Sequence, residues 1–589
     1  MKLRNLFTAT ILIAIIGFSI AGCDNGTNPG GGDNDPAVTE VTVTPATATV
    51  AQGQTKQFNA TVTGKNNPAQ TVTWTVTGGG NGTSINPSGL LTVAANETAA
   101  TLTVRAASTV DTSKSGTATV TITAPVPSVS WAVHDLATWG EAVNGIRNGG
   151  DNKSHIITVT GDFSALVSDG DTFGSVPGIT VNIEGNNTIS LSSGNGRLLQ
   201  IGEGQTVIVK NLTLQGRNNN NNPVVRINDG GTFRMEGSAS VTGNSTSTSG
   251  GGVYIYYNGT FIMQDNATVS GNTVNNSSYD AYGGGVYVFG GTFIMQDNAS
   301  VSGNTANCGR MNGYAYGGGV YVDGNSSYPG IFTMKDNATV KENTASLSYY
   351  SSNYAYGGGV YVDGGTFTLE DGAISDNTAN GGNYGSANGG GVYVYANNGG
   401  TFTMQNGTIS GNTAKGNQTA NGGGVYASIS ITVFTMQGGA ISGNTASATG
   451  SSYVDASGGG VYGNLIMQSG TISDNTVNAS GTSGSTTVYA SGGGVRGILT
   501  MQGGTISGNT VNASNRVNSN NVETYGGGVS GNPTKTGGTI YGNDAADDLR
   551  NIAIGGKGHA VYNFLDDNWR NATAGPAMNT DTYGFWLNE

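Results

Sequence analysis

The sequence has few of the side chains that bind transition metals or nucleic acids. Its 589 residues include only 2 Cys, 3 His and 23 Lys and Arg, against 36 Asp and Glu. So few thiols and imidazoles leave almost nothing from which to build a zinc, haem or iron–sulfur site. The formal net charge of −13 argues against a nucleic-acid partner, because few cations are available to neutralise phosphates. We therefore expect no cofactor and no nucleic acid.

Charged residues are also scarce, at 10%, whereas glycine is abundant, with 100 residues. The glycines follow no Gly-X-Y period, which excludes collagen. Hydrophobic residues still make up 36% of the chain and fall in short alternating runs, so the chain is not simply disordered. A chain of this length exceeds one compact core, which indicates several domains or a repeat array.

The N-terminus predicts secretion and a lipid anchor. Two cations and an apolar run over residues 6–20 indicate a signal peptide over residues 1–22, and the run is too short for a spanning helix. It ends in Ile-Ala-Gly-Cys, which resembles a bacterial lipobox and implies cleavage before Cys23 and lipidation of that residue. The alternative is an ordinary signal peptide followed by an incidental Cys. Lipidation would make the lipid bilayer a partner without any spanning segment.

This resemblance implies a place in the bacterial cell envelope, at the outer membrane or the cell surface. Asp24 follows the lipobox, and in some Gram-negative bacteria an Asp there keeps a lipoprotein at the periplasmic face of the inner membrane. Residues 23–36 are predicted to be the lipidated Cys and a flexible polar tether. With Cys23 acylated, Cys308 has no partner for a disulfide.

Residues 37–124 are predicted to form a small β-sandwich. Val, Thr and other β-formers alternate there with Gly, Asn and Pro breaks, as in several short strands. Their order resembles the bacterial Ig-like domain of group 2, whose fold implies that Trp74 is buried between two sheets. Such modules are mostly spacers and sometimes adhesive. Residues 125–130, which contain Pro, are a predicted stiff linker.

A helix and a long repeat array are predicted after the linker. Apolar residues lie near one face of a helix, namely Leu136, Trp139, Ala142, Val143 and Ile146. We expect a helical cap over residues 131–155, a parallel β-helix over residues 156–546, and a last coil and cap over residues 547–589. A cap would protect the first strands from edge-to-edge pairing.

Three short motifs recur every 32 to 40 residues. Gly-Gly-Gly-Val begins at residues 250, 283, 317, 357, 389, 422, 458, 492 and 526. Thr-Phe-x-Met or a variant follows, and then Ile-Ser-Gly-Asn-Thr or a variant. Each motif fits a short strand with alternate side chains inward, and three such strands wind into one coil of a parallel β-helix. The predicted fold class is therefore all-β, an Ig-like sandwich followed by a β-helix solenoid of about a dozen coils.

Asn and Gly are expected to shape the turns of this solenoid. The third motif places Asn at residues 244, 272, 304, 343, 377, 412, 444, 475, 509 and 543. Asn at the same turn of every coil can form a ladder of side-chain amides along the axis. The glycines of the first motif permit positive φ and close stacking of coils. Residues 558–562, Gly-His-Ala-Val-Tyr, are predicted to be a last, altered copy of that motif.

The repeats resemble those of polymorphic outer-membrane proteins, which are β-helical adhesins with a pectin-lyase-like fold. Those proteins carry GGA-[ILV] and F-x-x-N, and this chain carries Gly-Gly-Gly-Val and Ile-Ser-Gly-Asn from Gly231 onward. Gly replaces Ala, Ile or Val replaces Phe, and no C-terminal translocating barrel is recognised. The resemblance implies a right-handed parallel β-helix and adhesion to a host or cell-surface protein or glycan.

Many β-helical proteins degrade polysaccharides, so a carbohydrate-active enzyme is the alternative function. A lyase needs clustered carboxylates for Ca²⁺ and a basic residue, and a hydrolase needs paired carboxylates. One carboxylate column follows the Met or Leu of four consecutive coils, at Asp265, Asp297, Asp336 and Asp371. It is either a solvated ladder of turn residues or a weak Ca²⁺ site. No Arg or Lys column accompanies it and no nucleophile–base spacing is evident, so we expect no catalytic residues and a non-enzymatic protein.

Two sets of tyrosines are candidate binding residues. The first follows the Val of the first motif in seven consecutive coils, at Tyr254, Tyr287, Tyr321, Tyr361, Tyr393, Tyr426 and Tyr462. If the valines point inward, these rings form an exterior stripe, which is either a stacking ladder or an aromatic platform for sugars or a partner protein.

The second set lies in the variable segments between each ladder Asn and the next Gly-Gly-Gly. It comprises Tyr314, Tyr316, Tyr349, Tyr350, Tyr354 and Tyr356. These segments are predicted to be loops along one edge of the solenoid, and their Tyr, Ser, Asn and Gly content is typical of binding loops. We predict that a ligand contacts this edge, centred on residues 306–356. The alternative is that the loops merely keep the protein in solution.

Overall fold

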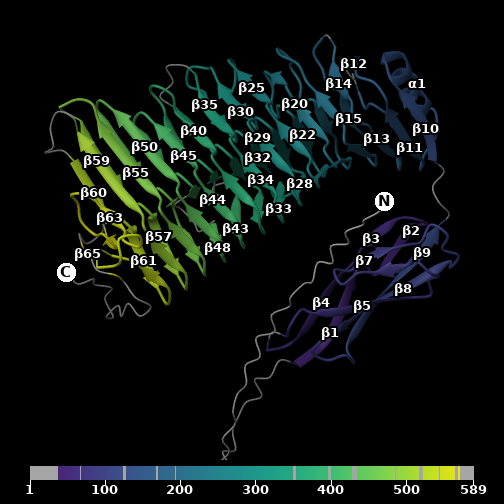
Figure 1. Ribbon diagram of the computed structural model, residues 1–589, viewed down its shortest axis with the longest axis horizontal. Coiled ribbons are helices and arrows are strands. Elements are labelled where there is room, and N and C mark those ends of the chain that lie inside the picture. The colour runs from purple at the N-terminus through teal and green to yellow at the C-terminus, as the bar shows by residue number, and fades with distance from the viewer. Residues whose placement is uncertain are drawn as a thin grey trace, which may run out of the picture. The chain divides into compact units, whose positions relative to one another are not determined.

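The computed structural model describes most of the chain after residue 36. The described ranges are 37–66, 68–123, 128–166, 170–192, 194–348, 353–395, 399–427, 434–484, 486–515, 522–542, 544–563 and 568–570, with residue 573. The predicted signal peptide, Cys23, Asp24 and the tether lie outside them. No helix within these ranges is long and apolar enough to cross a membrane. The chain divides into two compact units, residues 1–126 and 127–589 (Figure 1).

The first unit is a β-sandwich. Its strands pair as β1–β4, β2–β9–β8–β5 and β3–β7–β6. They are β1 (Ala37–Thr44), β2 (Thr47–Ala51), β3 (Thr55–Gln57), β4 (Asn59–Lys65), β5 (Val72–Thr77), β6 (Ser84–Ile85), β7 (Leu90–Thr92), β8 (Thr101–Ser108) and β9 (Ser115–Thr123). Alternate apolar side chains point into one core around the fully buried Phe58. The expected burial of Trp74 is only partial: Phe58 is the fully buried ring of this core, and the half-buried Trp74 ring packs against the core next to Gly89.

The second unit opens with a strand rather than with the predicted helix. β10 (Ser128–Val133) pairs in parallel with β11 (Ser154–Val159), and α1 (Leu136–Arg147) connects them. The first coil therefore begins inside the predicted linker and precedes the helix, because Val133 already points into the core of the β-helix. α1 runs within its predicted range and lies at the start of the strand stack (Figure 1).

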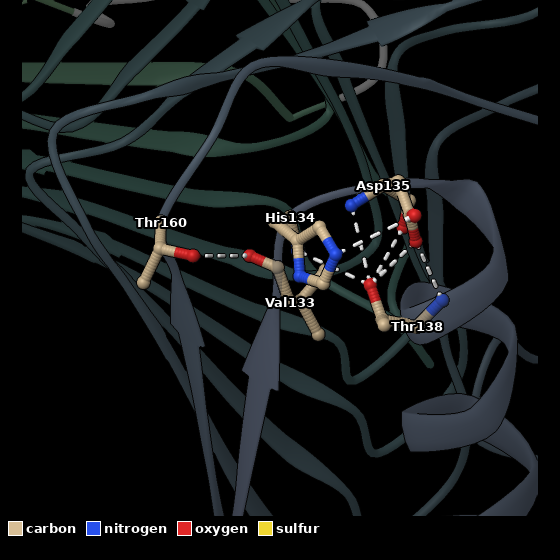
Figure 2. Close-up of polar contacts among 5 residues, drawn as sticks. All are labelled: Val133, His134, Asp135, Thr138 and Thr160. Atoms are coloured by element: carbon tan, nitrogen blue, oxygen red, sulfur yellow. Dashed lines mark hydrogen bonds and ion pairs between the residues drawn. The ribbon is translucent and has the colours of Figure 1, made fainter.

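A capping box fixes the start of α1 (Figure 2). The Asp135 carboxylate accepts a hydrogen bond from the Thr138 N–H at 2.8 Å, and the Thr138 hydroxyl accepts one from the Asp135 N–H at 3.2 Å. The contact satisfies an N–H group that a helix start otherwise leaves without a partner, and it lowers the pKa of Asp135. His134 Nε2 lies 3.6 Å from the same carboxylate. The Thr160 hydroxyl donates to the Val133 carbonyl at 3.3 Å and ties β10 to the following coil.

The second unit is a stack of parallel strands, so the predicted all-β fold class is confirmed (Figure 1). Each middle coil gives two strands to a 25-stranded sheet and one to a 13-stranded sheet. One such coil holds β27 (Val286–Phe289) and β28 (Thr292–Met295) in the first sheet and β29 (Ser300–Ser302) in the second. They pair in register with β32 (Val320–Asp323), β33 (Ile331–Met334) and β34 (Thr339–Lys341) of the next coil. The 13 strands agree with the dozen coils expected.

Like side chains stack on like inside the coils. Val286, Phe293 and Met295 are fully buried, so the valines of the first motif and the outer residues of the second point inward, as predicted. From Phe261 to Phe434 the rings of consecutive coils lie 4.7 to 4.9 Å apart and within 11° of parallel. This is the spacing of neighbouring strands, so no coil can bury its apolar face without its neighbours.

A ladder of buried Asn side chains runs along the coils. In its middle, Asn377 Nδ2 donates to Asn412 Oδ1 and to the Val340 carbonyl, both at 2.9 Å. Its Oδ1 accepts from the backbone N–H and from the Nδ2 of Asn343, both at 3.0 Å. Asn377 therefore satisfies two backbone groups of the preceding coil, and water cannot reach them because Asn343 and Asn377 are 0% exposed.

The last coil differs from the sequence prediction at one Asn. Asn551, not Asn543, continues the ladder by accepting from the N–H and Nδ2 of Asn509, because extra residues precede the turn there. Asn543 itself lies outside the described residues. The altered copy of the first motif is confirmed, since β64 (Val561–Asn563) pairs in parallel with β61 (Val529–Lys535). The short β65 (Asn568–Arg570) pairs antiparallel to β64 and covers the edge of the sheet.

The glycines of the first motif make the predicted tight turn. Gly357 has a φ of 62°, which only glycine adopts readily. At Gly358 a Cβ atom would lie 2.3 Å from the Thr378 backbone carbon and 2.4 Å from the Gly390 oxygen. The coils therefore approach too closely there for any side chain.

Each variable segment contains an outgoing and a return strand with a connection between them, where the sequence predicted a loop throughout. Their outgoing strands belong to a 10-stranded sheet and their return strands form an 8-stranded sheet. The outgoing strands include β25 (Thr273–Asn276), β30 (Thr305–Cys308), β35 (Thr344–Leu347), β40 (Thr378–Asn380), β45 (Thr413–Gly416), β50 (Thr445–Gly450), β55 (Thr476–Gly481) and β59 (Thr510–Asn515). The return strands are β26 (Ala281–Tyr282), β31 (Ala315–Tyr316), β36 (Tyr354–Tyr356), β41 (Ser386–Asn388), β46 (Thr419–Asn421), β51 (Tyr453–Ser457), β56 (Thr487–Ser491) and β60 (Val522–Tyr525).

A second core, separate from that of the coils, holds these segments together as strands. Small apolar side chains alternate with polar ones along both sheets and meet between them, as Ala306 and Ala315 do. Cys308 is buried in the same core. Because the side chains are small, the two sheets can bury them over very short strands that stack coil on coil.

Candidate binding site

The seven tyrosines of the first motif form one column outside the coils. They stand on β22 (Val253–Tyr256), β27, β32, β37 (Val360–Asp363), β42 (Val392–Tyr395), β47 (Val425–Ala427) and β52 (Val461–Tyr462), and they pair in register. The adjacent valines fill the core, so the rings point outward, as predicted. From Tyr361 to Tyr462 the rings lie 4.6 to 4.9 Å apart and within 9° of parallel.

The return strands of the variable segments cover this column. Tyr321 and Tyr361 are each only 4% exposed, so the rings are not the freely exposed stripe that the sequence suggested. Tyr316 meets Tyr361 edge-on at 4.9 Å, and Tyr282 meets Tyr321 edge-on at 5.3 Å. Tyr356 lies 4.7 Å from the next ring of the column, Tyr393. The cover comes from strands that the sequence interpretation took for loops.

We call this double row of rings the tyrosine seam. It comprises Tyr254, Tyr282, Tyr287, Tyr316, Tyr321, Tyr356, Tyr361, Tyr393, Tyr426 and Tyr462. Of the tyrosines predicted to contact a ligand, Tyr314 and Tyr354 lie half-buried at its outer margin, 6.1 and 5.5 Å from Tyr356. Tyr349 and Tyr350 lie outside the described residues. The structure thus brings the described tyrosines of both predicted sets together.

Two carboxylates accept hydrogen bonds from the seam. The Tyr287 hydroxyl donates to Asp323 Oδ2 at 2.8 Å, and the Tyr321 hydroxyl donates to Asp363 Oδ2 at 3.3 Å. Burial raises the pKa of Asp323 to about 6. Burial also raises the pKa of Tyr321 and Tyr361 well above the usual value of 10, so these phenols stay neutral at physiological pH.

The predicted carboxylate column forms hydrogen bonds with the backbone of its own turns. Asp297 Oδ2 accepts from the Asp265 N–H, and Asp336 Oδ2 accepts from the Asp297 N–H, both at 3.1 Å. Asp371 departs from the pattern and accepts from the Gly372 N–H at 2.8 Å. Nowhere in the described part of the chain are three or more His, Cys, Asp or Glu side chains grouped so that they could hold a metal ion. These contacts account for the column as turn residues.

An Arg occupies the coil before and the coil after the seven-tyrosine column. Arg226 pairs in register with Tyr254, and its guanidinium lies 5.3 Å from the centre of that ring and 5.2 Å from the centre of Tyr256. Both distances suit a cation–π contact. At the other end Arg496 pairs in register with Tyr462.

The seam ends beyond Arg496 in a cavity of about 260 Å³. In the column, Arg496 and then Ser530 stand where earlier coils carry Tyr. In the return strands, the position that Tyr316 and Tyr356 hold is taken by Asn388 and Asn421, then by Ser457 and Ser491, and then by Tyr525. Both rows lack a ring at Ser491 and Arg496, and the pocket lies there.

Rings, hydroxyls and charged groups together line this C-terminal pocket. Its lining residues are Tyr453, Asp455, Ser457, Tyr489, Ser491, Arg496, Glu523, Tyr525, Ser530 and Tyr562. None of them belongs to the predicted binding residues. The sequence signal that could have found it is the change from Gly-Gly-Gly-Val-Tyr to Gly-Gly-Gly-Val-Arg at residue 496.

Matches to known proteins cover short stretches of the chain. A family model of the immunoglobulin I-set domain matches residues 39–134, which confirms an Ig-like first unit, while the narrower bacterial group stays a prediction. The chain is 52% identical over 67 residues to the major capsid protein of Bacillus phage B103 and 47% identical over 62 residues to that of Bacillus phage PZA. These stretches cover 11% and 10% of this chain, and only 15% and 14% of the phage proteins.

Proposed function

We propose that the protein is a lipid-anchored lipoprotein of the bacterial cell envelope, at the outer membrane or cell surface, that acts as a non-enzymatic adhesin or interaction scaffold. The lipobox at Cys23 and the polar tether support the anchor. In this proposal the Ig-like unit is a spacer, and the β-helix presents the binding surface to a host or cell-surface protein or glycan.

Exposed tyrosines on the variable segments carry the interaction role. The core of the coils is complete without these segments, yet every middle coil adds one. Tyr279, Tyr384 and Tyr453 project from three of them and are 71%, 47% and 49% exposed. Tyr offers a large contact area at a low entropy cost, which suits exposed tyrosines to a binding surface.

Replacing each of the two Cys residues tests the anchor. In cells that produce the full chain, Cys23→Ser should abolish incorporation of a labelled fatty acid and release the protein from the membrane fraction. Cys308→Ser is the matched control, because its thiol is buried between the sheets of the variable segments and should not affect anchoring. Membrane association of Cys23→Ser equal to that of the unaltered chain would refute the anchor.

Replacing Tyr314 and Tyr354 tests the predicted binding edge. Both are half-buried at the outer margin of the seam, so Ser at these positions leaves the packed rings in place. Binding of the purified chain to a glycan or host-protein array should fall at least tenfold while the circular dichroism of the sheets is unchanged. Unchanged binding would refute this edge, and release of reducing or unsaturated sugars from the array would favour the enzyme instead.

A further inference from the structure

The C-terminal pocket has the lining of a small polar ligand site. We infer that it binds a single ring of a neutral sugar, such as the last residue of a glycan chain. This inference rests on the proposed interaction role and gives that role a ligand class and a position. It adds a contact at the last coils, where the seam is open, to the contact expected along residues 306–356, where the seam is filled by its own rings.

Two pairs of aromatic rings form the walls of the pocket. Tyr525 and Tyr562 are stacked at 4.2 Å with their planes 19° apart. Tyr453 and Tyr489 lie 5.6 Å apart and tilted by 42°. Tyr453 is 49% exposed, so this side of the pocket is open to solvent. The negative face of an aromatic ring attracts the polarised C–H groups that a sugar ring presents on its flat face.

Hydrogen-bond donors and hydrogen-bond acceptors both lie between these walls. The Ser457 hydroxyl donates to Asp455 Oδ1 at 2.8 Å and lies 3.0 Å from the Ser491 hydroxyl. The Tyr525 hydroxyl donates to Glu523 Oε2 at 2.6 Å. Carboxylates only accept, guanidinium only donates, and hydroxyls do both.

A serine and a guanidinium lie side by side in the lining. Ser530 is 1% exposed, and its backbone carbonyl accepts from Arg496 Nη1 at 3.5 Å. The hydroxyls of a sugar both donate and accept, so they can bond to a serine hydroxyl and to a carboxylate.

The charge balance of the pocket favours a neutral ligand over an ionic one. Asp455 and Glu523 would repel a phosphate or a uronate, and Arg496 would repel an amine. Burial raises the pKa of Asp455, because the low-dielectric surroundings disfavour its charged form. The hydroxyls of a neutral polyol can form hydrogen bonds with all three charged groups, and none of these groups repels them.

The size of the pocket limits the ligand to one ring. Its volume of about 260 Å³ lies just below the range of roughly 300–1,000 Å³ that is usual for small-molecule sites. The rest of a glycan would leave past the exposed Tyr453. A ligand of this size in a preformed site is expected to bind with a Kd of about 1 mM.

Four methyl glycosides are suitable probes, those of glucose, galactose, mannose and N-acetylglucosamine. Saturation-transfer NMR with the purified Cys23→Ser chain should detect saturable binding of at least one of them. Tyr453→Ser and Arg496→Gln should each weaken that binding at least tenfold. Tyr328→Ser is the matched control, because Tyr328 is 36% exposed between β32 and β33, outside the variable segments, and does not line the pocket.

The outcomes separate this inference from the proposed function. Binding of none of the glycosides overturns the inference, and so does binding that survives both pocket variants. Tighter binding of methyl glucuronide or of spermidine than of every neutral glycoside overturns the ligand class. None of these results affects the anchor, which the Cys23→Ser fractionation decides alone. Conversely, glycoside binding by a chain that is not membrane-bound in cells upholds the pocket and refutes the anchored role.

Discussion

Removing one amide from the middle of the Asn ladder should destabilise the β-helix strongly. In Asn377→Ala, the Asn343 N–H loses its acceptor and the Val340 carbonyl loses its amide donor. Two neighbouring groups keep a partner, because Asn343 Nδ2 still donates to the Val301 carbonyl and Asn412 Oδ1 still accepts from the backbone N–H of residue 377. The damage is therefore confined to two backbone groups.

The expected cost follows from those two groups. Asn377 and Asn343 are 0% exposed, so water cannot replace the missing side chain without opening the coil. A buried polar group left unsatisfied costs about 1–3 kcal/mol, which gives about 2–6 kcal/mol for Asn377→Ala. The coils stack in series, so local opening is expected to show first at amides near the lesion.

Asn337→Ala, in the preceding coil, provides the control. Asn337 is exposed and its Nδ2 forms only a long contact of 3.3 Å with Asn298, so its loss should change stability by less than about 0.5 kcal/mol. Urea unfolding followed by circular dichroism, with hydrogen exchange to locate the opening, compares the two variants. Equal midpoints for Asn377→Ala and Asn337→Ala would refute the view that the ladder satisfies otherwise unpaired backbone groups.

Three further predictions concern the glycines, a buried lysine and the seam. Gly358→Ala should lower the melting temperature, because backbone atoms occupy the space of the new Cβ; the expected loss of unfolding free energy is at the upper end of about 1–3 kcal/mol. Gly140→Ala in α1 is the counterpart: no atom lies within 4 Å of its new Cβ, so it should stabilise the fold by about 0.5–1 kcal/mol. The opposite order would contradict the geometry. Lys535 stands in register after Met501, where earlier coils carry Met, and burial lowers its pKa from 10.5 to about 8. Burying its charged ammonium therefore destabilises the fold fully below pH 8, and this destabilisation disappears as the pH rises towards 10.5. Lys535→Met should therefore raise the melting temperature more at pH 7 than at pH 10, and an equal rise would argue against a buried charge. Ser491→Tyr should place a ring in the pocket, extend the seam and abolish glycoside binding without loss of stability. Retained glycoside binding would contradict the view that a Tyr at this position fills the pocket.

Much of the coil could be predicted because each of its strands carries a strong local signal. Val286, Phe293 and Met295 recur in register with large apolar side chains at a period of two, and the pattern alone sets which side chains point inward. The Asn ladder was equally accessible, since a polar residue at a fixed place in every repeat indicates side chains that bond to one another along the axis. The exception, Asn551, follows an irregular stretch in which the repeat spacing is lost.

The variable segments could not be predicted as strands from their local pattern. Their inward residues are mostly Ala, as at Ala306 and Ala315, and Ala next to Ser, Asn and Gly is the composition of a loop. Only pairing with the same segment in neighbouring coils makes such a sequence extended. The burial of the tyrosine column depended on the same unseen strands, so its direction was predicted correctly and its exposure was not.

The tyrosine seam and the C-terminal pocket differ only in which side chains stand at corresponding positions of successive coils. A stack of parallel strands in register places corresponding residues at a constant spacing, so the volume of each side chain decides whether the space beside it is filled or open. Tyr in both rows fills it, as between Tyr316 and Tyr361. Ser491 facing Arg496 and Ser530 leaves it open without altering the coil, because the inward Val495 and Val529 are unchanged and fully buried. In such a fold a binding site can form without any change of the backbone. Substitutions on the outer face of two strands suffice, because the buried side chains on the inner face stay the same.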